Sequence, residues 1–232
     1  MSTQSPVVIV LVHGAWWSGD WWWQGVTDPI VARGHRVYTP TLTGLGSRAH
    51  LLSSAINLST HISDIVNLIQ WEQLSDIVLV GHSYGGMVIS GVAEKVPEGT
   101  IRSIVYLDAF LPEDGQALAD IADNIEQVVG QSDPVPPPLW FAGDNKKIAD
   151  TLANGSPHPR ACFFEKLKLT GKRDNIPLKT YVWAEQSPTF TYFYERLKTD
   201  STWRVEKLHC GHMTMIELPV QTADIILHAS EY

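Results

Sequence analysis

The chain has 232 residues, of which 44% are hydrophobic and 18% charged, a composition typical of a globular domain with a large core. Its formal net charge is -8, and no run of lysine or arginine could follow a nucleic-acid backbone or an anionic membrane. Residues 1–6 lack the basic stretch of a signal peptide, and the longest apolar run, 7–12, is too short to span a bilayer, so we expect a soluble, cytoplasmic protein.

Short β-branched runs alternate with helix-length segments along much of the chain. A strand at 7–13 is followed by a helix over 21–34 and a second strand at 36–41. The later strands are expected at 76–82, 103–107, 180–183 and 203–208, and the later helices behind the possible N-caps Ser59 and Thr60, over 84–95, and near Pro219. This alternation predicts an α/β fold with a mostly parallel sheet covered by helices on both faces.

The alternation stops between residues 111 and 178. Proline-rich residues 133–138 interrupt this segment, and helical patches are expected at 117–129 and 146–153. We therefore expect residues 1–110 and 179–232 to form the core, and residues 111–178 to form a small, partly helical cap.

Neither of the two cysteines belongs to a metal or disulfide pattern. Cys162 and Cys210 have no C-x-x-C spacing and no companion cluster of histidines and cysteines. We expect free thiols, and a protein that needs no metal and no cofactor.

The strand at 76–82 leads directly into Gly81-His82-Ser83-Tyr84-Gly85-Gly86 and then into a helix, which is the expected context of a G-x-S-x-G nucleophile elbow. The turn places a strained serine at the carboxyl edge of the sheet, and glycines two residues before and after it avoid collisions. The helix that follows directs backbone N–H groups at developing negative charge. Ser83 is therefore the expected nucleophile.

A serine hydroxyl needs a base, and nine histidines are available. His212 follows the last strand and precedes the final helix, where a loop returns to the carboxyl edge, so it is the expected base. His209 is the second choice. His13 and His82 adjoin glycines in tight turns, where a structural role is expected.

The first strand ends in His13-Gly14-Ala15-Trp16, which is similar to the turn that supplies an oxyanion-hole N–H beside such elbows. We expect the backbone N–H groups of Ala15 and Tyr84 to hold the oxygen of a tetrahedral intermediate. Each such donor typically contributes a factor of about 100 to 1,000 in rate.

Over nearly its full length the chain resembles the α/β-hydrolase fold, in the branch of plant methylesterases and hydroxynitrile lyases, small bacterial carboxylesterases and carbamate hydrolases. Besides the elbow, the residues that carry the resemblance are 13–16 with Gly19 and Trp22, and the stretches 41–46, 106–112 and 211–213. The lyases of this branch carry a threonine in place of Gly14 and a lysine in place of Met213. A cyanide leaving group needs that positive charge, so hydrolysis is the better interpretation.

The resemblance leaves the acid of the catalytic triad open. In plant members the aspartate follows the strand that corresponds to 180–183, and alignment from Trp183 places it at Ser187, which carries no charge. The role then moves to Asp108, at the end of the strand beside the nucleophile strand, or alternatively to Glu185. Asp108 is preferred because its strand ends at the same edge of the sheet.

Aromatic residues on the loops and the cap predict an apolar substrate pocket, formed by Trp16, Trp17, Trp140, Phe141 and Trp183. The expected protein is a serine esterase that cleaves a small, uncharged, apolar or aromatic ester or carbamate through an acyl-enzyme. A lyase and a ligand receptor with a slow hydrolase site are the alternatives. Its expected partner is a small-molecule substrate, and we expect a monomer or homodimer.

Overall fold

The computed structural model describes residues 6–123, 125–139 and 145–231, and in this part of the chain six strands form one sheet. All strand pairs are parallel, and the order is β2-β1-β3-β4-β5-β6. The strands are β1 Val8–Val12, β2 Arg36–Tyr38, β3 Ile77–Ser83, β4 Ile101–Ala109, β5 Leu178–Ala184 and β6 Arg204–Leu208. The predicted fold class is confirmed, and each predicted strand overlaps an observed one.

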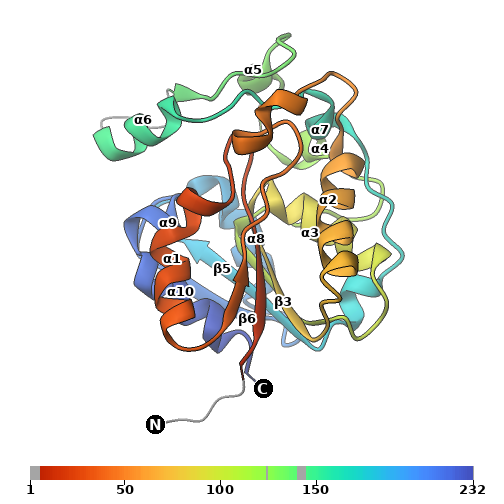
Figure 1. The fold of residues 1–232 in the computed structure, drawn as a ribbon, viewed down its shortest axis with the longest axis vertical. Helices are drawn as coiled ribbons and strands as arrows, with labels where there is room; N and C mark the ends of the chain where they lie inside the picture. The colour runs from red at the N-terminus through yellow and green to blue at the C-terminus, as the bar shows by residue number, and fades with distance from the viewer. Residues whose placement is uncertain (1–5, 124, 140–144, 232) are drawn as a thin grey trace.

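Helices cover both faces of the sheet because successive strand residues point to opposite sides (Figure 1). In β1, Ile9 and Leu11 pack in one apolar cluster, whereas Val10 and Val12 pack in the other. The first face carries α1 Asp20–Ala32, α9 Thr214–Glu217 and α10 Pro219–His228, and the second carries α2 Leu58–Trp71, α3 Gly85–Lys95 and α8 Thr191–Leu197.

The start of α2 differs from the prediction. Asn57, and not Ser59 or Thr60, is the N-cap residue, because its side chain accepts the backbone N–H of Thr60 at 3.0 Å. The Thr60 hydroxyl lies 3.3 Å from the Asn57 backbone N–H, which completes a capping box. Thr60 therefore contributes to the cap from inside the helix.

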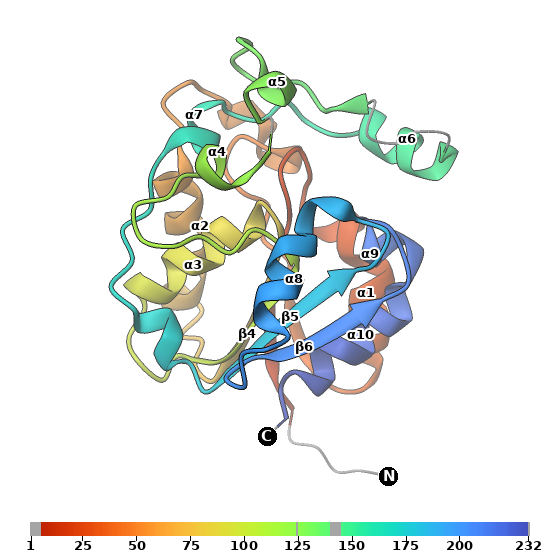
Figure 2. The same ribbon diagram turned by 180° about the vertical axis from the view of Figure 1, so that it is seen from behind.

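Residues 111–178 contain short helices that lie beyond the carboxyl ends of the strands (Figures 1 and 2). They are α4 Leu118–Ile121, α5 Ile125–Val129, α6 Lys146–Ala153 and α7 Ala161–Phe164. The 3-10 turn η3 Lys172–Asn175 lies instead just before β5, at the opposite edge of the sheet, where the Lys172 N–H donates to Glu94 at the end of α3. The single helical patch expected over 117–129 is two helices, because Ala122 adopts an extended conformation and ends α4. We call residues 111–178 the cap, and propose that the part that carries α4 to α7 covers this edge, whereas the chain from η3 onward returns to the opposite edge to begin β5.

Two more 3-10 turns lie close to the same edge of the sheet, η1 Gly46–Leu51 and η4 Pro188–Phe190. Among the helices of the described residues, none is both long enough and apolar enough to cross a membrane.

Candidate active site

Ser83 is the last residue of β3 and has a backbone φ of 54°, in the left-handed region that residues with a side chain rarely occupy. Glycines make this turn possible because neighbouring backbone segments come too close to leave room for a Cβ atom. A Cβ atom at Gly81 would lie 2.6 Å from the carbonyl oxygen of Gly85, and one at Gly85 would lie 2.7 Å from that of Val12. The turn thus has the geometry expected of a nucleophile elbow, with α3 beginning two residues later.

The imidazole of His212 contacts Asp108. Its Nδ1–H donates to Asp108 Oδ2 at 2.7 Å, and the other carboxylate oxygen of Asp108 accepts the backbone N–H of Ala184 at 3.0 Å. Asp108 is fully buried, lies at the end of β4 and has a left-handed φ of 43°. Two donors therefore hold the carboxylate, and the carboxylate sets the tautomer and orientation of His212.

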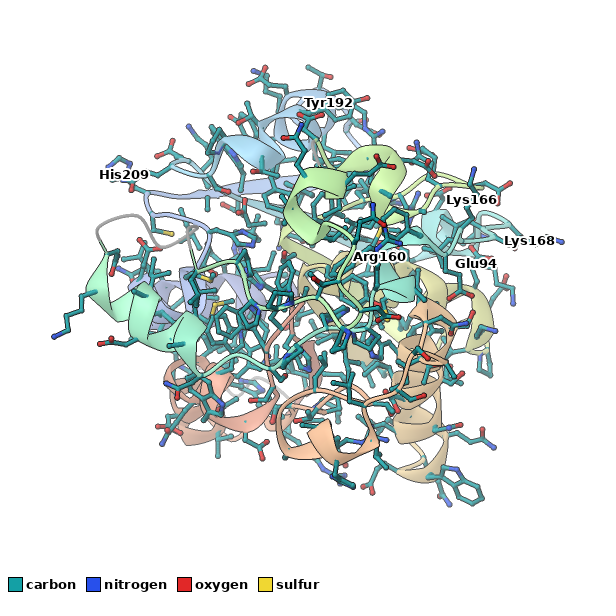
Figure 3. The ribbon with its side chains drawn as sticks, turned by 90° about the horizontal axis from the view of Figure 1, so that it is seen from above. Glu94, Arg160, Lys166, Lys168, Tyr192 and His209 are labelled. Atoms are coloured by element: carbon teal, nitrogen blue, oxygen red, sulfur yellow. The ribbon has the colours of Figure 1, made fainter. Side chains whose placement is uncertain are left out.

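The alternative acid and base lie elsewhere. Glu185 binds Lys207 Nζ at 3.0 Å and His209 Nδ1 at 2.9 Å, and the hydrogen bonds to these two side chains lower the pKa of the Glu185 carboxyl. The His209 side chain is 82% exposed and lies at the rim of the molecule (Figure 3). Asp108, in contrast, hydrogen-bonds the His212 imidazole directly.

Two aromatic rings flank the His212 imidazole. Phe190, in η4, stacks on it with ring centroids 5.0 Å apart, and the His82 ring lies 4.5 Å away. His82 Nε2–H also donates to the backbone carbonyl of His212 at 3.0 Å, which connects the turn at Ser83 to the loop that carries His212. Burial, followed by the charge of His212, keeps the pKa of His82 well below its ordinary value.

His13 orients the peptide that carries the Ala15 N–H. Its Nδ1–H donates to the carbonyl of Gly14 at 2.8 Å, and its Nε2 accepts the N–H of Leu42 at 3.1 Å. Both bonds require a neutral ring, and burial lowers the pKa of His13 to about 4. A side chain at Gly14 would crowd Ser83, because its Cβ would lie 3.0 Å from Ser83 Cβ.

Ser83 and His212 line one cavity of about 190 Å³ together with Ala15 and Tyr84. Its other walls are mostly apolar and come from the loop after β1, the end of β4, the cap, η4 and the loop after β6. They include Trp16, Trp17, Phe110, Leu118, Ile125, Val128, Leu152, Phe163, Phe190 and Met213. Such a cavity suits a small apolar or aromatic group that reaches the Ser83 hydroxyl.

The predicted pocket residues divide into three groups. Trp16 and Trp17 line the cavity, whereas Trp140 and Phe141 lie outside the described residues. Trp183 does not line it among the described residues, because its ring stacks on Tyr194 at 4.3 Å and its Nε1–H points to the Ser187 carbonyl. Sequence reasoning missed Phe190 and Phe163, since an isolated phenylalanine in an irregular segment carries no pattern that distinguishes a pocket wall from core.

Both cysteines are free and buried. Burial raises the pKa of the Cys162 thiol and of the Cys210 thiol to about 12 in each case. Because the thiolate is the reactive form, neither side chain is poised to act as a nucleophile.

Comparison with known proteins gives related sequences over nearly the whole chain. The family model described as "Alpha/beta hydrolase family" matches residues 9–225. A carbendazim hydrolyzing esterase from Nocardioides sp. (strain SG-4G) is 37% identical over 237 residues, which cover 93% of this chain and 96% of that protein. Methylesterase 1 from Arabidopsis thaliana is 32% identical over 126 residues, which cover 50% of this chain and 44% of the plant protein.

A solved structure is similar over the full length of the fold. It is an extracellular alpha/beta-hydrolase from a Paenibacillus species, described as sharing structural and functional homology with tobacco salicylic acid binding protein 2. The TM-score is 0.83 at 26% sequence identity, and the match covers 97% of this chain and 99% of that one.

Proposed function

The chain belongs to the alpha/beta hydrolase family and is an esterase-type hydrolase, and we propose that it cleaves small, uncharged carboxylic esters or carbamates through a serine acyl-enzyme. The observation that carries the proposal is the 2.7 Å contact between His212 and Asp108, with His212 and Ser83 lining one apolar cavity. Ser83 is the nucleophile, His212 the general base and Asp108 the acid of the proposed triad.

The chemistry follows from these positions. Because Nδ1–H of His212 is committed to Asp108, Nε2 is the nitrogen that accepts a proton. His212 takes the Ser83 hydroxyl proton as Oγ forms a bond to the substrate carbonyl carbon, and then gives that proton to the departing alcohol as the ester bond breaks. Water repeats the sequence on the acyl-enzyme and restores the free serine.

The negative charge of each tetrahedral intermediate falls on the former carbonyl oxygen. The N–H of Tyr84, at the entry to α3, and the N–H of Ala15 are the proposed donors to that oxygen. They act on charge that exists only near the transition state, so they raise kcat more than they strengthen substrate binding.

The walls of the cavity support an apolar or aromatic group next to the scissile bond. The bacterial relative at 37% identity is named for its action on carbendazim, a carbamate, which supports carbamates beside simple esters as substrates. Gly14 and Met213 favour hydrolysis over lyase chemistry, since the lyases of this branch carry threonine and lysine there.

Ser83→Ala tests the proposal. Short-chain esters, aryl carbamates and anilides are screened with the purified protein, and kcat is measured on the best substrate. We expect a loss of roughly a thousandfold or more with the fold intact, because a small side chain fits the elbow. Ser187→Ala, a buried serine at the position where the resemblance placed the acid, is the matched control and keeps wild-type turnover.

Two outcomes would overturn the assignment. A Ser83→Ala variant that keeps more than about a tenth of wild-type kcat removes Ser83 from the mechanism. A wild-type burst of p-nitrophenol from p-nitrophenyl acetate without subsequent turnover indicates a ligand receptor that retains a slow hydrolase site.

A further inference from the structure

Trp16 occupies an unfavourable backbone conformation directly after Ala15. Its φ is 69°, and a bulky residue in this left-handed region must be held by its surroundings. Three hydrogen bonds do so. The Trp16 N–H donates to His158 Nδ1 at 3.3 Å, the Trp16 carbonyl accepts the Ser156 N–H at 2.8 Å, and the indole N–H donates to the Val135 carbonyl at 3.1 Å. All three partners belong to the cap.

Of these three partners, only His158 contacts Trp16 through its side chain, since Ser156 and Val135 use backbone atoms. His158 is fully buried, and its own backbone pairs with that of Val135 in both directions at 2.8 Å. Its ring packs edge-on against Tyr84, with ring centroids 4.9 Å apart, and lies at a tilt against Phe163, with centroids 4.7 Å apart. Burial keeps the pKa of His158 well below its ordinary value, so the ring stays neutral and can accept the Trp16 N–H.

His158 thus contacts both sides of the proposed oxyanion hole. On one side it fixes the peptide between Ala15 and Trp16, and on the other it packs against the ring of Tyr84. A hydrogen bond between the Tyr84 hydroxyl and His61 Nδ1, 2.9 Å apart, fixes the far end of the Tyr84 ring.

We propose that His158 is a positioning residue through which the cap holds Ala15 and Tyr84 in the geometry of the oxyanion hole. The inference rests on the proposed function. Without the acceptor at His158, the left-handed turn at Trp16 loses one of its three hydrogen bonds. The Ala15 N–H then no longer points at the position of the oxyanion. The affected interaction is made mainly in the transition state, so kcat falls while KM changes little.

His158 also belongs to a cluster with His61 and Cys162, in which one side-chain atom of each residue lies within 4.8 Å of the other two. The alternative role for this cluster is to bind a metal ion. The hydrogen bonds argue against a metal site there. His61 Nε2–H donates to the Thr43 carbonyl at 2.9 Å, which leaves Nδ1 to accept the Tyr84 hydroxyl. His158 Nδ1 accepts the Trp16 N–H, so its Nε2 carries a proton and offers no lone pair to a cation.

Two substitutions of His158 separate the contribution of its hydrogen-bond acceptor from that of its ring packing. His158→Phe keeps an aromatic ring against Tyr84 and Phe163 but removes the acceptor. His158→Asn removes the ring but places a carbonyl oxygen near the former position of Nδ1. We expect His158→Phe to lower kcat by about ten- to a hundredfold with KM within about threefold, and His158→Asn to recover a large part of kcat.

Binding of an aryl trifluoromethyl ketone provides the second measurement. The ketone carbon forms a bond to Ser83 Oγ, the hydroxyl proton passes to His212, and the new oxyanion occupies the same hole as the transition state. We expect His158→Phe to weaken this inhibitor by about the factor lost in kcat. Cys162→Ala is the control, since Cys162 lies in the same cluster but its thiol faces the Ile56 carbonyl and His61 Nδ1, and we expect wild-type kcat and inhibition.

The inference is wrong if folded His158→Phe keeps kcat and inhibitor affinity within twofold of wild type, or if His158→Asn loses as much as His158→Phe. Should His158→Phe fail to fold, hydrogen exchange of the Trp16 amide in the wild-type enzyme decides, because an unprotected amide contradicts the bond to His158. Failure of the proposed function is distinguishable, since it would appear as full activity of Ser83→Ala, whatever the His158 variants do.

Discussion

The sheet edge and the cap contribute different kinds of residue to the same cavity. Ser83 and Asp108 lie at the ends of β3 and β4, His212 lies on the loop after β6, and two of these residues hold positive φ values fixed by the adjoining strands. The cap contributes apolar side chains such as Leu118 and Ile125 from short helices. We infer that the sheet edge determines the reaction and the cap determines which substrate reaches it, with His158 as the point where the cap also affects the chemistry.

The largest effect is expected at the sheet edge, from Asp108→Asn. The amide cannot stabilise the charge that develops on His212 and favours the wrong tautomer, so kcat falls by up to about ten-thousandfold while KM stays near wild type. Steady-state kinetics on the best substrate, with circular dichroism to check folding, measures the change. An intact fold with nearly intact turnover would remove Asp108 from the triad.

Glu185→Gln is the matched control, because it is the other carboxylate considered for this role. Its side chain binds Lys207 and His209 instead of His212, so we expect turnover within about twofold of wild type. The reverse ranking of the two variants would assign the acid to Glu185, and equal, modest losses would mean that the two carboxylates share the role.

Acid should destabilise the fold around both regions, because neutral histidines are buried at the sheet edge, in α2 and, with His158, in the cap. Burial lowers the pKa of His13 and of His61 from 6.5 to about 4. Between about pH 4 and pH 6.5 each of these histidines binds a proton in the unfolded chain but not in the folded chain. Their contribution to the free energy of unfolding is therefore fully present above about pH 6.5 and is lost as the pH falls toward 4. Each such histidine adds to this loss, and thermal unfolding measured across that window should show a steadily falling Tm.

A variant of one of these histidines checks the cause. His61→Gln cannot titrate, so its Tm should depend less steeply on pH than that of the wild type, although it starts lower. Equal slopes for the two proteins would show that other groups are responsible for the acid sensitivity.

The smallest effect is expected in the cap, from Ile125→Ala in α5. The truncation enlarges the cavity and removes apolar contact with substrate, so KM rises roughly five- to tenfold while kcat stays within about twofold. Val129→Ala, in the same helix but not among the residues that line the cavity, should leave KM unchanged. A large fall in kcat in Ile125→Ala would contradict the division between the two regions.

Much of the sheet edge could be predicted from the sequence because its conformation is determined locally. Strand, turn and helix follow each other within residues 77–95, and glycines at the close approaches leave few other conformations for Ser83. The family followed from this elbow together with the other short motifs along the chain, and the parallel sheet followed from the alternation of strands with helices. Both are confirmed. The loop of His212 could be placed because it follows the last strand of a parallel sheet.

The cap could not be predicted to the same depth. One helical patch became α4 and α5, and Trp183 turned to stack on Tyr194 instead of facing the cavity. His158 is separated from Trp16 by 142 positions, and no periodicity relates the two. These features depend on tertiary contacts between irregular segments, which a single sequence does not encode in a recognisable pattern.

The most direct test of the central claim is to find the covalent intermediate. The wild-type enzyme is mixed with p-nitrophenyl acetate, quenched in acid during the burst, digested and analysed by mass spectrometry. We expect one acetyl group on the peptide that contains Ser83, and none on that peptide in Ser83→Ala. Full turnover with no acetyl group on Ser83, or with the acetyl group on another residue, would contradict the account.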